Sequence, residues 1–383
     1  MPTFLFKIDH YGKLKVFFSI IITVCFLVNS FSLSGQDSTE EVAGGTNILA
    51  NLHYGYVIPE YSSFTLLTID PVRSLEFSVE KRLGERNPWN QVFNHPIVGL
   101  TFFYTTLGNN EIHGSEYSLF PYVLLPVFER EQFKAGISMG LGLGYVTKKY
   151  DQETNPFNVV VGSQLNVHFQ TKIDLRFRIT ERLGIQSGLA FGHLSNANTA
   201  EPNIGINNGT VYLGLSYQLK KQSITTDNDL FQADKNWFYE FAIAPGFKST
   251  RALRDSRHMT ASATGDIWKP VSRIVAFGIG PDIFFDSSAE TELLSDLNTE
   301  YEPIMQWSTG IHGSISLRYD RLRLILQVGF YLGLQNEVEN ESIYNRAMVR
   351  YTLTDDFFIY FAMKSHLHIL DHPELGFGYR WGK

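Results

Sequence analysis

The chain has 383 residues, 14% of them aromatic, with 31 glycines, one cysteine and a formal net charge of -7. This acidic balance argues against a nucleic-acid partner, because binding to a phosphate backbone favours a basic surface. The cysteine is Cys25, so the chain has no pair of cysteines and a disulfide framework is excluded.

The first 35 residues have the layout of a cleaved secretory signal. Three lysines precede an apolar run over residues 16–28, and a small-residue stretch, 32–35, follows it. The run is shorter than the ~20 apolar residues that a membrane-spanning helix needs, and no later segment reaches that length without a charge. We therefore predict a signal peptide over residues 1–35 and a mature chain, residues 36–383, that has no transmembrane helix.

Strict alternation of apolar and polar side chains runs through residues 164–180, and the same pattern returns over 321–335. A period of two residues indicates a β-strand, and both segments exceed the roughly five or six residues of a usual globular strand. The polar row of the first segment carries Lys172, Asp174 and Arg176. A soluble sandwich could not bury these charges, whereas a barrel with lipid outside and a polar interior accommodates both rows.

Weaker alternation along the rest of the chain brings the expected total to roughly sixteen strands, within the size range of bacterial barrels. We predict an all-β protein, an antiparallel transmembrane β-barrel over residues 36–383, with roughly 14–16 strands closed as one barrel. The alternative is an eight-stranded barrel, residues 46–222, followed by an extra β domain, residues 233–383. The last predicted strand, 375–381, alternates aromatic residues with glycine and arginine. Outer-membrane barrels commonly end in this way, so the pattern indicates the outer membrane of a bacterial cell.

Candidate catalytic side chains lie at the end of a predicted strand over residues 182–195. His193 and Ser195 share a face of this strand, so an imidazole can reach a hydroxyl and act as its base. Their parity is that of the apolar row, which predicts that both face lipid. Asn207 has the apolar parity of the next strand if the extended register continues back through the turn. All three side chains are then expected to meet on the outer wall, where a nucleophile would meet the ester bonds of lipids.

This stretch also resembles the signature of a known family. The run His193-x-Ser195-Asn196-Ala197, followed by Pro202-Asn203-x-Gly205-Ile206, is similar to that of the outer-membrane lipid A 3-O-deacylases of the PagL type. The resemblance implies an eight-stranded barrel and a carboxylic ester hydrolase that removes an ester-linked acyl chain from lipid A. It further implies that Ser195 is the nucleophile, His193 its general base and Asn196 an oxyanion donor.

The sequence departs from the family pattern at one position of the site. The family has a glutamate that orients the histidine, and Asn207 stands at the matching position. An amide can hold the imidazole tautomer but brings no negative charge to stabilise the imidazolium. Glu201, in the same loop, is a possible substitute.

Two functions therefore follow from the sequence. The first is a lipid esterase whose partner is lipid A, or lipopolysaccharide, in the outer leaflet. The second is a non-catalytic outer-membrane barrel, a channel or a structural protein, that retains a degenerate deacylase motif. No cofactor is expected, because the chain has no Walker A loop, no His-Glu-x-x-His and no dinucleotide fingerprint. His366, His368 and His372 form only a weak metal-binding pattern, and no metal site is predicted.

Overall fold

The structure is a computed structural model. It describes residues 42–59, 64, 67–84, 87–197, 200–224, 236–249, 257–295, 301–332, 342–366 and 369–382. The predicted signal peptide, residues 1–35, lies outside the described residues. Among the described residues, no helix has the length and the apolar character to cross a membrane.

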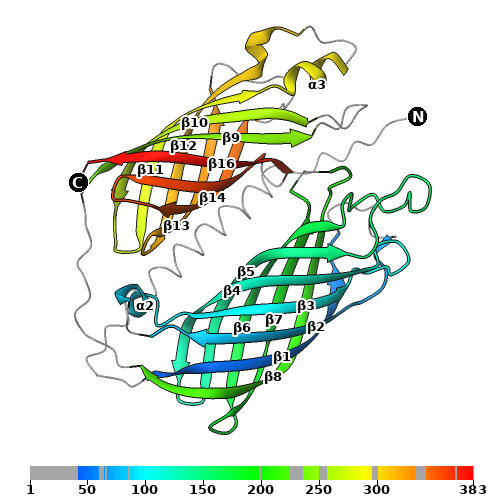
Figure 1. The fold of residues 1–383 in the computed structure, drawn as a ribbon, viewed down its shortest axis with the longest axis vertical. Helices are drawn as coiled ribbons and strands as arrows, with labels where there is room; N and C mark the ends of the chain where they lie inside the picture. Colours follow the sequence, from blue (N-terminus) through cyan, green and yellow to red (C-terminus); the bar gives the residue numbers. More distant parts are fainter. Residues whose placement is uncertain are drawn as a thin grey trace, which may run out of the picture.

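The strands form two closed barrels of eight antiparallel strands each (Figure 1). The strands of barrel 1 are β1 (Val42–Val57), β2 (Val72–Arg82), β3 (Ile97–Thr106), β4 (Ser115–Arg130), β5 (Phe133–Val146), β6 (Leu165–Arg178), β7 (Leu183–Ser195) and β8 (Ile206–Ile224). A short helix, α2 (Pro88–Val92), lies between β2 and β3. Each strand pairs with the next in sequence, and β8 pairs with β1 to close the barrel.

Barrel 2 repeats this up-and-down order. Its strands are β9 (Phe238–Ser249), β10 (Arg257–Pro270), β11 (Val275–Asp286), β12 (Trp307–Tyr319), β13 (Leu322–Tyr331), β14 (Ile343–Thr352), β15 (Phe357–His366) and β16 (Ile369–Trp381). The helix α3 (Ala289–Ser295) and the 3-10 turn η2 (Pro303–Gln306) lie between β11 and β12. Closure comes from the pairing of β16 with β9.

The predicted all-β, antiparallel barrel class is confirmed, whereas closure as a single large barrel is not what forms. The pairing of β8 with β1 leaves barrel 1 without a free edge that could receive β9. The arrangement agrees with the alternative of an eight-stranded barrel followed by a second β unit. That second unit is itself a closed barrel.

The alternating sequence separates an apolar outer wall from a polar interior. In β6, Leu165 and Ile173 are exposed on the outside, whereas His168, Lys172 and Asp174 are buried inside the barrel. Such a band of outward apolar side chains is the surface that a bilayer covers in an outer-membrane barrel.

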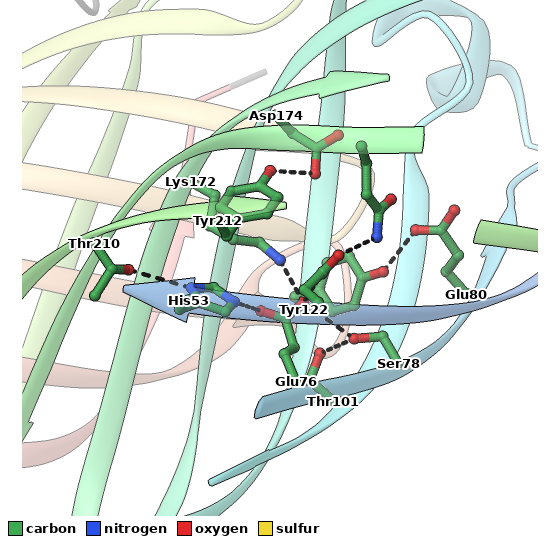
Figure 2. A network of polar contacts seen from close by, with 12 residues as sticks. His53, Glu76, Ser78, Glu80, Thr101, Tyr122, Lys172, Asp174, Thr210 and Tyr212 are labelled. Atoms are coloured by element: carbon green, nitrogen blue, oxygen red, sulfur yellow. Dashed lines mark hydrogen bonds and ion pairs between the residues drawn. The ribbon is translucent and has the colours of Figure 1, made fainter. Parts of the chain in front are cut away.

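Charged side chains pair with one another in the interior of barrel 1 (Figure 2). Glu76 accepts hydrogen bonds from Asn51 Nδ2 at 2.9 Å and from Lys172 Nζ at 2.6 Å, and its Oε2 lies 3.1 Å from Nε2 of His53. Glu80 accepts a hydrogen bond from the hydroxyl of Tyr122 at 2.6 Å. An eight-stranded barrel is only wide enough for side chains to fill, and these groups fill it.

The two ends of barrel 1 differ in the length of their connections. At one end, residues 131–132 and 179–182 form short turns, and the connection over residues 83–96 contains the helix α2. At the other end, residues 147–164 and 196–205 form loops whose described residues include no helix or strand. Outer-membrane barrels have short periplasmic turns and longer extracellular loops. The end at which β7 finishes is therefore the extracellular end.

The helix α2 contacts the short turns of barrel 2, and Figure 1 shows it between the two barrels. The rings of Trp89 and Phe93 lie 6.4 and 5.6 Å from the ring of Tyr319, and the guanidinium of Arg318 lies 5.1 Å from the ring of Trp89. The hydroxyl of Tyr319 also donates to Oδ1 of Asn90. This contact joins the periplasmic ends of the barrels.

Candidate active site

Three side chains meet on the outer wall of barrel 1 at the extracellular end of β7. The β7–β8 register pairs His193 directly with Asn207, and Ser195 follows on the same face of β7. Nε2 of His193 lies 3.0 Å from Oγ of Ser195, and Nδ1 lies 2.7 Å from Oδ1 of Asn207. The structure thus brings together the three residues that the sequence predicted to meet.

The outward parity of the site is visible in its neighbours. Leu189 and Phe191 precede His193 in the same row of β7 and are exposed, and Val211 follows Asn207 in the outward row of β8 with 55% of its surface exposed. Ser195 itself is only 8% exposed, because the loop over residues 196–205 packs beside it. The site therefore lies at the border between the apolar band and the extracellular loops.

The hydrogen-bond chain fixes the positions of the protons on His193. The Oδ1 atom of an amide can only accept, so Nδ1 of His193 must donate to Asn207. In the neutral ring Nε2 then carries the lone pair, and the hydroxyl of Ser195 donates to it. This is the tautomer in which the imidazole can remove the proton from a serine nucleophile.

Amide side chains hold the loop that follows the nucleophile. The backbone N–H of Asn196 donates to Oδ1 of Asn203 at 2.8 Å, and Nδ2 of Asn196 donates to the carbonyl of Ala200 at 2.7 Å. The first bond ties the start of the loop to its second half, and the second ties it to the middle of the loop. The predicted oxyanion donor, Asn196, therefore lies next to Ser195 with its side chain bonded within the loop.

Gly205 makes a close approach to the catalytic candidates. Its φ is +79°, a left-handed conformation that favours glycine. A Cβ at this position would lie 3.0 Å from Cε1 of His193 and 3.4 Å from Cβ of Ser195. The glycine of the motif therefore fits both the turn of the backbone and the space left by the imidazole.

The loop between β5 and β6 supports the site from the extracellular side. The N–H of Gly205 donates to the carbonyl of Val160 at 3.3 Å, and Val161 forms a β-bridge with Asn203. Leu194 and Ile206 alternate with the site residues, point inward and are buried in a cluster with Val57, Phe64, Val72, Leu107, Val146, Val160 and Val161. This apolar layer backs the wall on which the site stands. Sequence reasoning missed it because the loop over residues 147–164 has no periodic pattern.

Two side chains contact the imidazole of His193. Nε2 has Ser195 as its partner, and Nδ1 has Asn207. Asn207 therefore contacts the ring nitrogen for which the sequence also offered Glu201 as a possible partner.

The second barrel does not repeat this arrangement among its described residues. His366 is buried, and its Nε2 lies 2.8 Å from the hydroxyl of Tyr331, whereas Phe357, Ile359 and Phe361 form the exposed row of β15. His368 lies outside the described residues. Within the described part of the chain, no group of three or more His, Cys, Asp or Glu side chains is placed to hold a metal ion.

Comparison with protein families divides the chain as the barrels do. Residues 74–216 match the family model lipid A 3-O-deacylase (PagL), and residues 237–383 match the model acyloxyacyl hydrolase, C-terminal domain. Each barrel thus matches a PagL-type family model of its own. The first match contains His193, Ser195 and Asn207, and the second coincides with barrel 2.

Solved structures that resemble the chain include two outer-membrane barrels. Neisserial surface protein A is 13% identical, with a TM-score of 0.33, and the match covers 47% of this chain and 100% of that one. The outer membrane enzyme PagL is 16% identical, with a TM-score of 0.29, and the match covers 43% of this chain and 97% of that one. A search of curated proteins found no match.

The family matches and the fold agree with each other. Both models are named for hydrolases, and the two eight-stranded closed barrels have the fold of outer-membrane β-barrels.

Proposed function

We propose that this protein is a lipid esterase of the outer leaflet, which hydrolyses an ester-linked acyl chain of lipid A through Ser195, His193 and Asn207. The observation that supports this proposal is the hydrogen-bond chain from Asn207 through His193 to Ser195. Because it lies on the lipid-facing wall, the nucleophile would meet membrane esters. The proposal includes export to the outer membrane after removal of the signal peptide over residues 1–35.

The mechanism follows from the tautomer of His193. Nε2 takes the proton of Ser195 as Oγ attacks the ester carbonyl carbon and the carbonyl oxygen becomes an oxyanion. The C–O bond to the sugar then breaks, and the imidazolium returns the proton to the sugar oxygen, which leaves an acyl-serine. Water, deprotonated by Nε2, attacks the acyl-serine, and the fatty acid and the free serine are released.

Asn196 takes the role of oxyanion donor in this proposal. It directly follows the nucleophile, and amide donors aimed at a developing oxyanion contribute about 3 kcal/mol of transition-state stabilisation. Its side chain donates to the carbonyl of Ala200 in the structure. The amide would therefore have to turn, or share its donors, when the ester binds.

Asn207 is proposed as the residue that positions His193. It fixes the imidazole through the 2.7 Å contact, but it supplies no negative charge to the imidazolium. We therefore expect turnover that is slower than a carboxylate at the same position would support.

Mass spectrometry of lipid A tests the proposal. The refolded full chain and its Ser195→Ala variant are incubated with lipid A, and Ser187→Ala is the matched control because Ser187 lies on the same face of the same strand. We expect loss of a hydroxyacyl mass with the wild type and with Ser187→Ala, but not with Ser195→Ala. Unchanged lipid A with folded wild type, shown by heat-modifiable gel mobility, would refute the esterase.

A channel is the less supported function. Each barrel has eight strands, and buried ion pairs such as Glu76–Lys172 and Asp282–Arg346 occupy the interiors. Steady ion conductance by the purified protein in planar bilayers would support the channel function.

A further inference from the structure

The lipid-facing wall has a gap immediately beside the pair of His193 and Asn207. The outward row of β8 reads Asn207, Gly209, Val211, Leu213, Leu215 and Tyr217, so one position in it has no side chain. The register pairs Gly209 with Phe191 of β7 on one side and with Tyr56 of β1 on the other. We call the space between these two aromatic side chains the Gly209 notch.

The dimensions of the notch suit a hydrocarbon chain. Neighbouring strands lie about 4.8 Å apart, so the Cβ atoms of Phe191 and Tyr56 are separated by about 10 Å, across two strand spacings. Carbon atoms in van der Waals contact are about 4 Å apart, so one aliphatic chain fits between the two side chains. A bulky side chain at residue 209 would occupy this path.

Ile58 bounds the notch on the side of the loops. A Cβ on Gly209 would meet Ile58 Cδ1 at 3.1 Å and Cγ1 at 3.6 Å, and these are the neighbours within 4 Å. The backbone N–H of Ile58 donates to the carbonyl of Asn207 at 2.8 Å, which fixes Ile58 relative to the site. The tip of Ile58 therefore lies against the space above Gly209, and no other heavy atom, apart from those of the adjoining residues in the chain, lies within 4 Å of that space.

We propose that the Gly209 notch holds the carbons of the acyl chain next to the ester while Ser195 attacks; this inference rests on the proposed function. The reacting carbonyl carbon must lie about 3 Å from Oγ of Ser195. From there the acyl chain favours a path into the hydrocarbon, because apolar surface leaves water. Phe191 lies next to His193 along β7, whereas Gly209 lies next to Asn207 along β8. The open path thus runs over Gly209.

The proposal gives the enzyme a preference for long acyl chains. An acetyl group ends before it reaches the notch, whereas a dodecanoyl chain must pass through it. A side chain that fills the notch should therefore act against long chains selectively. A difference of one methylene in a hydrophobic site changes specificity by about 10- to 200-fold, which sets the expected scale.

The experiment compares hydrolysis of p-nitrophenyl dodecanoate and p-nitrophenyl acetate by the refolded full chain in detergent micelles. Gly209→Val fills the notch with a β-branched side chain that suits a strand. Ala50→Val is the matched control, because Ala50 faces lipid on β1 between Phe77 and Leu215, away from the site. We expect Gly209→Val to lower the dodecanoate-to-acetate ratio of kcat/KM at least tenfold and Ala50→Val to leave it unchanged.

If folded Gly209→Val keeps the wild-type dodecanoate-to-acetate ratio of kcat/KM while Ser195→Ala is inactive, the proposed role of the Gly209 notch is wrong. The proposed esterase activity is then still supported. Hydrolysis that is absent in the wild type, or that survives Ser195→Ala, would refute the esterase instead. In that case a photo-crosslinking experiment tests whether the Gly209 notch binds an acyl chain. Methyl dodecanoate with a diazirine near its ester is photo-crosslinked to the Ser195→Ala protein. Label concentrated on Phe191, Tyr56 and Ile58 supports the notch, and label spread evenly over the lipid-facing wall overturns it.

Discussion

Nδ1 of His193 lies 2.7 Å from Oδ1 of Asn207, across the β7–β8 pair. Aspartate has the same shape as asparagine, so Asn207→Asp keeps the contact and adds the negative charge that stabilises an imidazolium. Replacing the aspartate of a Ser-His-Asp enzyme with asparagine costs about 10⁴-fold in kcat because the histidine takes the wrong tautomer. His193 already has the correct tautomer, so we expect the added charge to give a smaller gain, about tenfold, in esterase kcat.

The matched control for this gain is Asn207→Leu, which removes the acceptor and should lower kcat below that of the wild type. Esterase assays of all three proteins, each checked for heat-modifiable mobility, decide the matter. If Asn207→Asp is no faster than the wild type although it is folded, Asn207 is not the partner that stabilises His193 during the reaction.

Gly205 should tolerate no side chain. Its φ is +79°, and a Cβ would lie 3.0 Å from Cε1 of His193, so Gly205→Ala strains the backbone by roughly 1 kcal/mol and also pushes the imidazole. A displacement of about 1 Å in a catalytic group can cost about 100-fold in rate. Gly382→Ala is the control, because Gly382 also has a positive φ, +89°, but a Cβ there would meet the carbonyl of Trp237 at 3.2 Å, beside barrel 2. Equal esterase losses in the two variants would contradict the specific effect on His193.

The local pattern of the site could be predicted from the sequence because a strand has a fixed period. Once His193 was placed in the apolar row, Ser195 had to share its face, and one continuous register brought Asn207 opposite. The closure of the barrels could not be predicted in this way. Whether β8 pairs with β1 or with β9 depends on contacts between distant residues, and the alternation of apolar and polar side chains is the same in either case.

The contacts that the loop residues make could not be predicted from the sequence pattern either. Asn203 was part of the motif, but its bond to the N–H of Asn196 and its bridge to Val161 depend on the course of an irregular loop. Glu201 was a possible partner of His193 only because it lies in the same loop as the motif. Sequence proximity does not show which side chain reaches His193, whereas the strand register does.

The stability of barrel 1 should depend on the pairing of the charge on Glu76 with that on Lys172. Glu76→Gln keeps the shape of the side chain but leaves the buried Lys172 without the carboxylate that lies 2.6 Å from its Nζ. Removing one partner of a buried ion pair costs about 3–5 kcal/mol of stability. The double variant Glu76→Gln, Lys172→Met has no unpaired charge at this contact and should recover at least about 1 kcal/mol. Urea unfolding followed by gel mobility measures both, and a double variant no more stable than the single one would contradict this account.

The extracellular loops should loosen in acid. Burial lowers the pKa of His113 below its ordinary value, although the hydrogen bond to Asn158 opposes this shift. The folded loop therefore favours the neutral imidazole. This contribution to stability is present above the ordinary histidine pKa and is lost as the pH falls through that value toward the lowered one.

Hydrogen exchange measures this effect of pH. Nδ1 of His113 lies 3.2 Å from Oδ1 of Asn158, in the loop that also supports Gly205 through Val160. We expect faster amide exchange over residues 109–114 and 155–161 at pH 5 than at pH 7, after correction for intrinsic rates. His113→Phe, which can keep the ring contact with Phe64, should remove the extra exchange in acid. The same pH response in that variant would assign the effect to another group.

The two barrels should remain joined at their periplasmic ends in the membrane. Nδ2 of Asn87 lies 3.4 Å from Oδ2 of Asp320, beside the packing of Trp89 on Tyr319 and Arg318. Cysteines at positions 87 and 320 should therefore be linked quickly by a short bismaleimide. A protease site inserted within residues 226–235 allows the chain to be cut between the barrels, and a gel then shows whether the two fragments remain linked. Cysteines at positions 180 and 320 are the control, because Thr180 lies in another turn at the same end of barrel 1. Trp89→Ala removes a buried ring, a loss that costs about 3–5 kcal/mol in a core, and should lower the yield of the 87–320 link. Equal yields from the two cysteine pairs would mean that α2 does not hold the barrels together.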